Sequence, residues 1–199
     1  MLQQEREKLW NRESEYLSIG ITQGGRPRGS IAVPWIRTGH AFNMRTPNVY
    51  LSPQDLLDEE IMAKVCQFRV IGCYIWVPLT DYSFIRRFAA LEDLYILRGE
   101  NIRDLEFLEG LLECDMIFLQ DAQLQNLEKI VQLHQQGQGI FHGPRCLCLE
   151  GCRVEDMSAL LQEGVWFSEL LIACPKGSNE QERWEAVDAI DRSYVEYEV

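Results

Sequence analysis

The sequence predicts an α/β fold, a short solenoid of strand–turn–helix units that stack side by side. Residues 91–131 carry the main observation, because their residue types recur at a spacing of 22 positions. In this alignment Tyr95 falls on Ile117, and Leu105 falls on Leu127. A fixed period in the twenties is typical of repeat architectures, in which neighbouring units bury each other's apolar faces.

The composition is that of a globular domain with an acidic surface. The chain has 199 residues, of which 46% are hydrophobic, enough for a sizeable core. Its net charge of -12 argues against nucleic acid or an anionic membrane as the main partner and favours a basic protein. Seven cysteines, mostly beside apolar runs, indicate reduced core thiols of a cytoplasmic protein. No signal peptide or membrane span is visible.

Residues 1–46 predict an N-terminal cap that precedes the repeats. A short helix is expected within 2–17, and a hairpin within 16–36, where the turn-forming run QGGRPRG separates two apolar runs. Residues 1–45 carry seven Lys/Arg and four Asp/Glu, whereas the remainder carries twelve and twenty-seven. The head is therefore expected to dock on the acidic body, with an acidic partner as the alternative.

Residues 47–199 predict about six units, each a strand followed by a polar cap and a helix. Pro53 directly after Ser52 favours a helix that begins there and runs to about Cys66. The predicted strands are 47–52, 70–77, 94–97, 116–119, 146–149 and 170–173, with a last strand at 194–199. The residues expected at the helix starts are Ser52, Ser83, Asp104, Asn126, Asp156 and Ser178.

The spacing also indicates an insertion between Val131 and Arg145. Leu124 to Val154 is a step of 30 residues, eight more than the period. The inserted loop, 132–145, is rich in Gly and Gln. Insertions in repeat proteins project from one face and often carry binding, so this loop is a candidate contact site.

Three units match the pattern LxxLxLxxN/CxL. The best match is 147–154, with Cys152 in the Asn/Cys position, where the two preceding units carry Ala122 and Glu100. Over about residues 47–199 the chain therefore resembles leucine-rich-repeat proteins, and its Asp-Leu and Asn-Leu pairs are similar to those of bacterial internalin-type repeats. The resemblance implies a non-catalytic module, of bacterial origin, that binds proteins on its concave sheet face. Because the family's Asn ladder is missing, the turns must be held by other groups.

Both faces of the predicted strands are apolar, which leaves an apolar stripe across the sheet. The preferred phase directs Tyr95, Leu97, Ile117, Leu119, Leu147 and Leu149 to the core and Ile96, Phe118, Cys148 and Ile172 to the open face. The opposite phase leaves Tyr95, Ile117, Leu147 and Leu171 outside. Either the head at 1–45 or the loop 132–145 covers the stripe, or it is an interface for a partner or a second copy.

The candidate protein-binding residues lie along this stripe and in the inserted loop. They are Ile96, Arg98, Phe118, Gln120, Glu150, Ile172, His134, Phe141 and His142. The expected partner is a protein. Because the chain itself is acidic, we expect a basic partner, for which this chain would act as an inhibitor or immunity-type protein. A homodimer is the alternative, and neither nucleic acid nor a membrane is expected.

A second class of function would use the histidines and cysteines near the loop. His134, His142, Cys146, Cys148 and Cys152 are ligand types that zinc uses and would also supply a thiol–imidazole pair. The cysteines alternate as strand core residues do, and the group has no CxxC. We therefore expect small buried side chains, with no catalytic residue, metal or cofactor. A third alternative is a purely structural domain whose sheet is covered internally.

Overall fold

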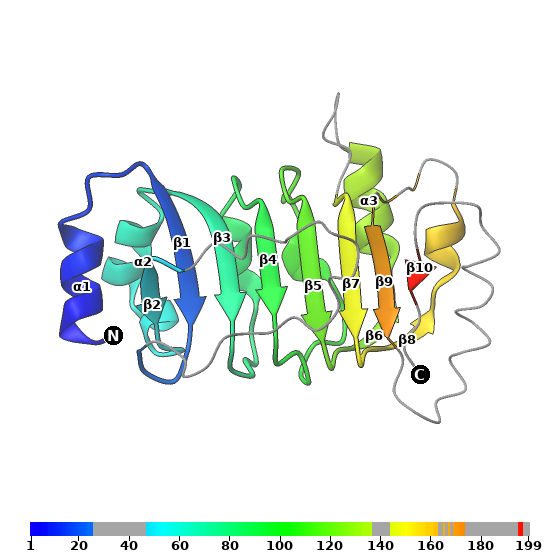
Figure 1. Ribbon diagram of the computed structural model, residues 1–199, viewed down its shortest axis with the longest axis horizontal. Helices are drawn as coiled ribbons and strands as arrows, with labels where there is room; N and C mark the ends of the chain where they lie inside the picture. Colours follow the sequence, from blue (N-terminus) through cyan, green and yellow to red (C-terminus); the bar gives the residue numbers. More distant parts are fainter. Residues whose placement is uncertain are drawn as a thin grey trace.

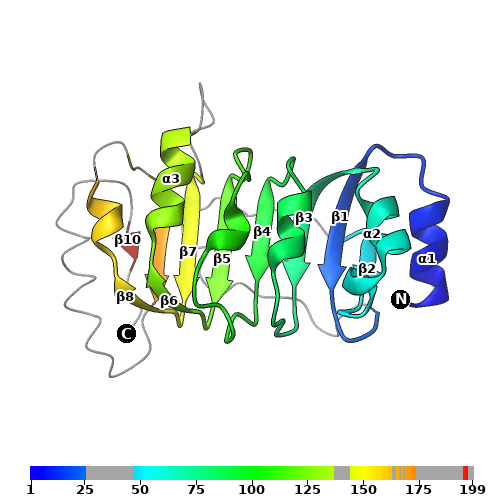
Figure 2. The same cartoon turned by 180° about the vertical axis from the view of Figure 1, so that it is seen from behind.

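The computed structural model shows an α/β fold around an eight-stranded sheet, which confirms the predicted class. All neighbouring strands of this sheet are parallel, in the order β10-β9-β7-β5-β4-β3-β1-β2, and their arrows point the same way in Figure 1. Helices α2 and α3 lie on one face of it (Figure 2). The structure describes residues 1–25, 47–136, 144–162, 165, 167, 169–173 and 195–196.

The six strands predicted between residues 47 and 173 occur within about two residues of their predicted ends. The main sheet consists of β1 (Tyr16–Ile21), β2 (Val49–Leu51), β3 (Arg69–Ile75), β4 (Asp93–Ile96), β5 (Met116–Gln120), β7 (Cys146–Glu150), β9 (Glu169–Ala173) and β10 (Val195–Glu196). A second sheet pairs β6 (Gln123–Asn126) with β8 (Arg153–Asp156), also in parallel. Of the last strand, predicted at 194–199, the structure describes residues 195–196, which form β10.

Most helical segments are shorter than predicted, because each unit leaves room for about one turn. The helices are α1 (Gln3–Trp10), α2 (Glu59–Val65) and α3 (Glu128–Gln136), and the 3-10 turns are η1 (Asp55–Leu57), η2 (Ser83–Arg87), η3 (Glu106–Leu108) and η4 (Ser158–Leu161). Gly110, with φ of 83°, follows η3 in a conformation that favours glycine. The helix predicted after Ser178 lies outside the described residues.

A carboxylate or amide begins most of these turns. Asp104, Asn126 and Asp156 each accept a hydrogen bond from the backbone N–H two residues on, at 3.0, 3.1 and 2.8 Å. Asp58 and Asp81 make the same contact, at 3.0 and 2.8 Å. This local side-chain contact satisfies an N–H that the first turn leaves without a backbone partner. The predicted side-chain contacts of Asp104, Asn126 and Asp156 are thus present, although the N-cap residues of η3 and η4 are Leu105 and Met157, one position later than predicted.

The single helix predicted from Ser52 to Cys66 is wrong. The chain forms η1, extends at Asp58, and then forms α2. The break lies at Asp58, whose backbone is extended, whereas Asp55 and Ser52 begin η1: the Asp55 carboxylate accepts hydrogen bonds from the amide and the hydroxyl of Ser52, both at 2.6 Å. Ser52 is therefore held in a local turn, and Asp58 caps the helix by accepting from the amides of Glu60 and Ile61.

Strand β1 is not one arm of a hairpin, as predicted for 16–36. It lies inside the sheet between β2 and β3 and runs parallel to both. Both of its edges are occupied, so a hairpin partner has no edge on which to pair. The sheet therefore continues across the boundary predicted at residue 46, and the second predicted arm lies outside the described residues.

The strand register corrects the predicted faces. Leu94 pairs with Ile117, not Tyr95, and Ile117 pairs with Leu147. The first step is therefore 23 residues rather than 22, and the second is the predicted 30. Because side chains alternate along a strand, this one-residue difference exchanges the faces of Tyr95 and Ile96.

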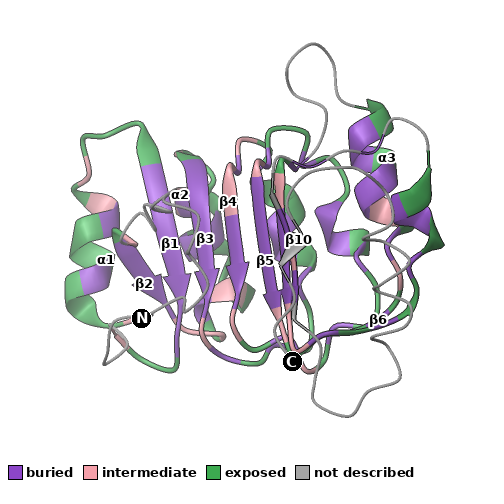
Figure 3. Ribbon diagram, turned by 45° about the vertical axis from the view of Figure 1, so that its right-hand side comes forward, coloured by how far each residue is buried: buried purple, intermediate pink, exposed green. Residues whose placement is uncertain are grey.

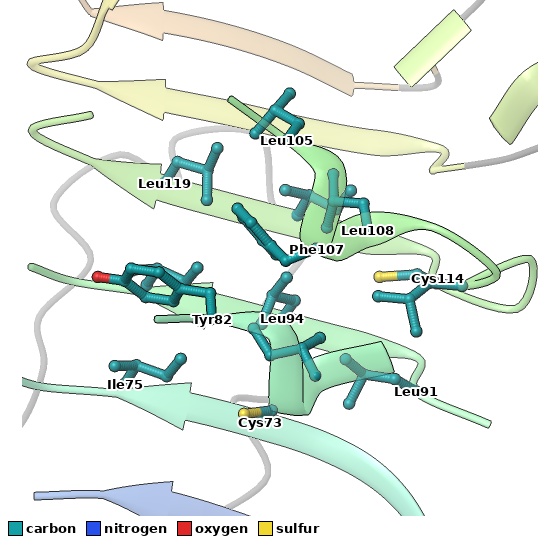
Figure 4. Close-up of a cluster of buried hydrophobic side chains, with 14 of the residues drawn as sticks. Cys73, Ile75, Tyr82, Leu91, Leu94, Leu105, Phe107, Leu108, Cys114 and Leu119 are labelled. Carbon is teal, nitrogen blue, oxygen red and sulfur yellow. The ribbon is translucent and has the colours of Figure 1, made fainter. Parts of the chain in front are cut away.

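The main core lies between the sheet and its helical face. Ile96 and Ile172 belong to it, contrary to expectation, together with the predicted Ile117, Leu119, Leu147 and Leu149. Figure 4 shows part of this core, where Cys73, Leu94 and Leu119 from the strands pack with Leu105, Phe107 and Leu108 from the η3 region. Figure 3 shows that the strands are buried along most of their length.

Substitution of Ile96 tests this register. Ile96 is fully buried in the main core, whereas Leu97 is half-buried. Ile96→Ala should lower the free energy of unfolding by about 2–5 kcal/mol, because it leaves a cavity. Leu97→Ala, the matched control, should cost less than about 1.5 kcal/mol. Urea denaturation measures both, and a larger loss for Leu97→Ala would place Ile96 on the wrong face.

Asp55 should contribute stability that depends on pH. Burial alone would raise the pKa of its carboxyl, but hydrogen bonds from the Met1 ammonium at 2.8 Å and from Ser52 outweigh burial and hold the pKa below its ordinary value. The stabilisation is complete above the ordinary carboxyl pKa of about 3.9 and is lost as the pH falls through the lower folded-state pKa.

Asp55→Asn should therefore lower the free energy of unfolding by about 1.5–3 kcal/mol at neutral pH. The difference from the wild type should shrink as the pH approaches about 2, where the wild-type carboxyl is protonated as well. Urea titrations across this range measure it, and a difference that stays constant with pH would contradict the proposed ion pair.

Candidate binding surface

Five aromatic rings form a ladder across the sheet face opposite the helices. The aromatic ladder consists of Tyr50, Trp76, Tyr74, Tyr95 and Phe118, from strands β2 to β5 and the residue after β3. Successive ring centroids lie 6.2, 5.9, 5.2 and 5.7 Å apart. Offset rings at such separations attract one another beyond the area that they bury.

A glycine in β1 makes room for this ladder. Gly20 lies between Tyr50 and Tyr74 in the sheet register. A Cβ atom on Gly20 would lie 2.8 Å from Trp76 Cζ3 and 2.9 Å from Tyr50 Cδ1. The ring contact between Tyr50 and Trp76 over β1 therefore requires a residue without a side chain.

Most of the aromatic ladder is buried and Trp76 is half-buried, which agrees with the covered alternative for the apolar stripe. Tyr74 is fully buried, and Tyr95 and Phe118 are each 3% exposed. Helices α2 and α3 lie on the other face of the sheet (Figures 1 and 2). The covers predicted for this face were the head and the inserted loop, whose segments 26–46 and 137–143 lie outside the described residues.

Acidic residues lie at the carboxyl ends of strands β4, β5 and β7, along one side of the sheet where these strands end. Glu100 accepts from Arg98 Nε at 2.5 Å. Asp121 has a φ of 61°, and its amide donates to the carbonyl of Glu150 at 2.9 Å. A Cβ atom on Gly151 would lie 2.8 Å from Asp121 Oδ1. Glu100, Asp121 and Glu150, hereafter the acidic edge, thus belong to adjacent turns.

The surroundings of Asp121 in the acidic edge shift the pKa of its carboxyl. Desolvation, followed by repulsion from Glu100, raises the pKa of Asp121, and Arg98 offsets this only in part. Asp121 makes no hydrogen bond through its carboxylate to the described part of the chain. An exposed carboxylate beside a like charge gains when a cation approaches, so this edge favours a positively charged group.

The turns are held without the family's Asn ladder. Gly99 N donates to the carbonyl of Gln120 at 2.9 Å, and Arg153 N donates to that of Ala122 at 2.8 Å. The Cys152 thiol donates to the carbonyl of Leu119 at 3.3 Å. Backbone hydrogen bonds between adjacent turns, with one thiol, therefore carry out the role expected of the missing side chains.

The structure removes four of the predicted contact residues from the surface. Ile96 and Ile172 face the main core, and Phe118 lies in the aromatic ladder. His134 is buried in α3 rather than exposed in a loop, because α3 extends to Gln136. Its Nδ1 lies 3.0 Å from the Ile130 carbonyl, and its ring packs edge-on against Phe167 with centroids 5.0 Å apart.

Three other predicted residues lie together at the acidic edge. Arg98 is exposed, and Gln120 and Glu150 are half-buried neighbours in the register of β5 and β7. Phe141 and His142 lie outside the described residues. Asp121 is not among the predicted contact residues, and its only sequence signal is an Asp directly after a strand, a residue type that tolerates positive φ.

Apart from the exposed Cys66, the cysteines that the structure describes lie in packed surroundings. Burial raises the pKa of the Cys73 and Cys114 thiols well above the ordinary value, which disfavours the reactive thiolate. Cys148 and Cys152 are buried and Cys146 is half-buried. Across the described ranges, no three His, Cys, Asp or Glu side chains are grouped so that they could hold a metal ion.

Two adjoining hollows lie on the helical face. They measure about 350 and 360 Å3 and share Thr80, Asp81 and Ser83 in their walls. Beside them, Arg86 donates to the Glu106 carbonyl, at 2.6 Å from one of its terminal nitrogens, and Arg87 lies 3.3 Å from Glu59. The guanidinium groups here are already paired, so the hollows are weaker binding candidates than the acidic edge.

No protein-family model matches the chain, and neither curated proteins nor solved structures yield a match. The resemblance to leucine-rich repeats therefore rests on the sequence pattern alone. None of the helices in the described residues is long and apolar enough to cross a membrane.

Thiol labelling of the native protein tests the packing of the cysteines. Cys66 is exposed and should react with iodoacetamide within minutes, whereas Cys73, Cys114, Cys148 and Cys152 should react only after unfolding. Mass spectrometry of the labelled peptides measures each site. Rapid labelling of Cys148 or Cys152 in the folded protein would instead support thiol chemistry near the inserted loop.

Proposed function

We propose that this chain is a non-catalytic protein-binding module, built as a leucine-rich-repeat-like solenoid, and that its acidic edge binds a basic protein. The observation that carries the proposal is the arrangement of Glu100, Asp121 and Glu150 in adjacent turns at one edge of the sheet. Two basic side chains lie beside these acids and both are held locally: Arg98 is paired with Glu100, and Arg103 donates to the Glu100 carbonyl at 2.7 Å.

The arrangement of the strands supports the solenoid. From β3 to β9 the main-sheet strands follow one another in chain order, each parallel to the last. A helix or a single helical turn on one face separates most of them. Strands β6 and β8, which follow β5 and β7, also pair with each other in parallel. Stacked units of this kind present their turns as a continuous edge, a common place for binding residues.

The charge distribution supports a basic partner. Residues 47–136 carry fifteen Asp/Glu and seven Lys/Arg. Many of these cations are paired with carboxylates, as in Arg69–Glu113, Arg86–Glu109 and Arg87–Glu59. The excess charge on the surface is therefore negative, and it would speed the encounter with a cationic protein and orient it.

The thiols support a reducing compartment. Cys66, Cys73 and Cys114 are free thiols, and no disulfide joins two of the cysteines that the structure describes. Such cysteines suit the cytoplasm, where thiols stay reduced.

Charge removal at the acidic edge tests the binding proposal. An oligolysine peptide serves as the cationic probe, and isothermal titration calorimetry measures its affinity. The triple variant Glu100→Gln, Asp121→Asn, Glu150→Gln should weaken binding by about tenfold or more, because three nearby attractions are lost. Asn at 121 tolerates the positive φ that Asp121 adopts.

The control is a second triple variant, Glu7→Gln, Glu13→Gln, Glu128→Gln, with the same net charge and exposed positions on other elements. It should bind the peptide nearly as tightly as the wild type. Equal losses in the two variants would mean that the peptide responds to net charge alone, and the assignment to the acidic edge would fail.

A further inference from the structure

The outer edge of β2 is one end of the main sheet. The inner edge of β2 pairs with β1, where the carbonyl of Leu51 accepts from Thr22 N at 2.8 Å. Successive residues of a strand direct their backbone groups to opposite sides, so the amide of Tyr50 faces outward. An outward-facing strand edge is a template on which another strand can pair.

Helix α1 closes this edge with a buried carboxylate. Glu5 Oε2 accepts from Tyr50 N at 2.7 Å, in the place where the carbonyl of a further strand would lie. Glu5 is 6% exposed, and its other oxygen lies 2.5 Å from Lys8 Nζ. Burial of a carboxylate is unfavourable unless it is paired and hydrogen-bonded, and Glu5 meets both conditions.

Two cationic groups of the same N-terminal segment contact acids on the body. The Met1 ammonium lies 2.8 Å from Asp55 Oδ1, and this pair is buried. Arg6 lies 3.1 Å from Glu60. The segment therefore offers the β2 edge one hydrogen-bond acceptor and two positive charges, and it covers the apolar surface there with Leu9, which is fully buried.

The other attachments of α1 are weak. The helix has eight residues, and its N-cap, Leu2, makes no side-chain hydrogen bond. Isolated helices shorter than about 12 residues are marginal in water. The Arg6–Glu60 pair is exposed on both sides and contributes little. Closure of the edge thus depends mainly on Glu5, on the Met1–Asp55 pair, and on the packing of Leu9, with Met1 and Trp10 beside it, against the core.

We propose that α1 is an autoinhibitory guard, and that the β2 edge it covers is a second binding site, one that takes an extended basic peptide segment. The peptide would add a strand beside β2, with a backbone carbonyl in place of the Glu5 carboxylate and cationic side chains toward Asp55 and Glu60. Strand addition of this kind combines backbone hydrogen bonds with side-chain selectivity. The site is separate from the acidic edge and does not depend on it.

The test compares Glu5→Ala with Glu7→Ala in the full chain. The probe is a short peptide of alternating valine and lysine, and calorimetry measures its affinity. Glu7 is exposed and shares α1, so both variants lose one negative charge. Simple electrostatics predicts weaker binding of the cationic peptide to both. If α1 blocks the β2 edge, Glu5→Ala should bind the peptide at least about tenfold more tightly than the wild type, because the state with an open β2 edge becomes populated.

Hydrogen exchange at the Tyr50 amide locates the binding. In Glu5→Ala this amide should exchange faster than in wild type, and the peptide should slow it again. Leu9→Ala, which loosens α1 and keeps every charge, should also raise the affinity and covers the case in which Glu5→Ala fails to fold. The proposal is overturned if neither variant binds more tightly, or if tighter binding leaves the Tyr50 amide unprotected. It is also overturned if light scattering shows that the variants pair with a second copy instead of the peptide.

Discussion

The sheet is buried on both faces, and the register between its strands is the constraint on which the other features depend. The paired residues Leu94, Ile117 and Leu147 point into the core under the helices. Their neighbours Tyr95 and Phe118 point to the opposite face, where they form part of the aromatic ladder. A slip of one residue would bring aromatic rings under the helical turns. Since both rows are apolar, side-chain shape distinguishes them: these strands contribute aliphatic side chains to the helical core and aromatic rings to the opposite face.

The local features of the fold follow from the sequence. Asp104, Asn126 and Asp156 begin their turns as expected, because a side chain and a backbone amide two residues apart need no distant partner. The 30-residue step is also correct, because every apolar position across it shifts together. Features that depend on one unit at a time can thus be predicted from a single chain.

The features that depend on distant contacts could not be predicted. The steps from β3 to β4 and from β4 to β5 are 21 and 23 residues, so a constant period placed Tyr95 on the wrong face. Turn chemistry after β1 suggested a hairpin, whereas β1 pairs with β3, more than fifty residues further along the chain. At the surface, Arg98 and Glu150 could be predicted because they directly follow predicted strands. The roles of Glu5 and Asp55 could not, because they depend on contacts between the N-terminal segment and the β2 region.

The aromatic ladder also gives the chain intrinsic spectroscopic signals that depend on its folding. Its rings come from β2, β3, β4 and β5, with Trp76 in contact with both Tyr50 and Tyr74. At centroid separations of 5.2 to 6.2 Å, the electronic transitions of the rings couple, and light absorbed by the tyrosines is passed on to the indole. The near-ultraviolet dichroism of the coupled rings, and the share of tryptophan emission that comes from Trp76 among the chain's five tryptophans, therefore register the assembly of four strands without any attached dye.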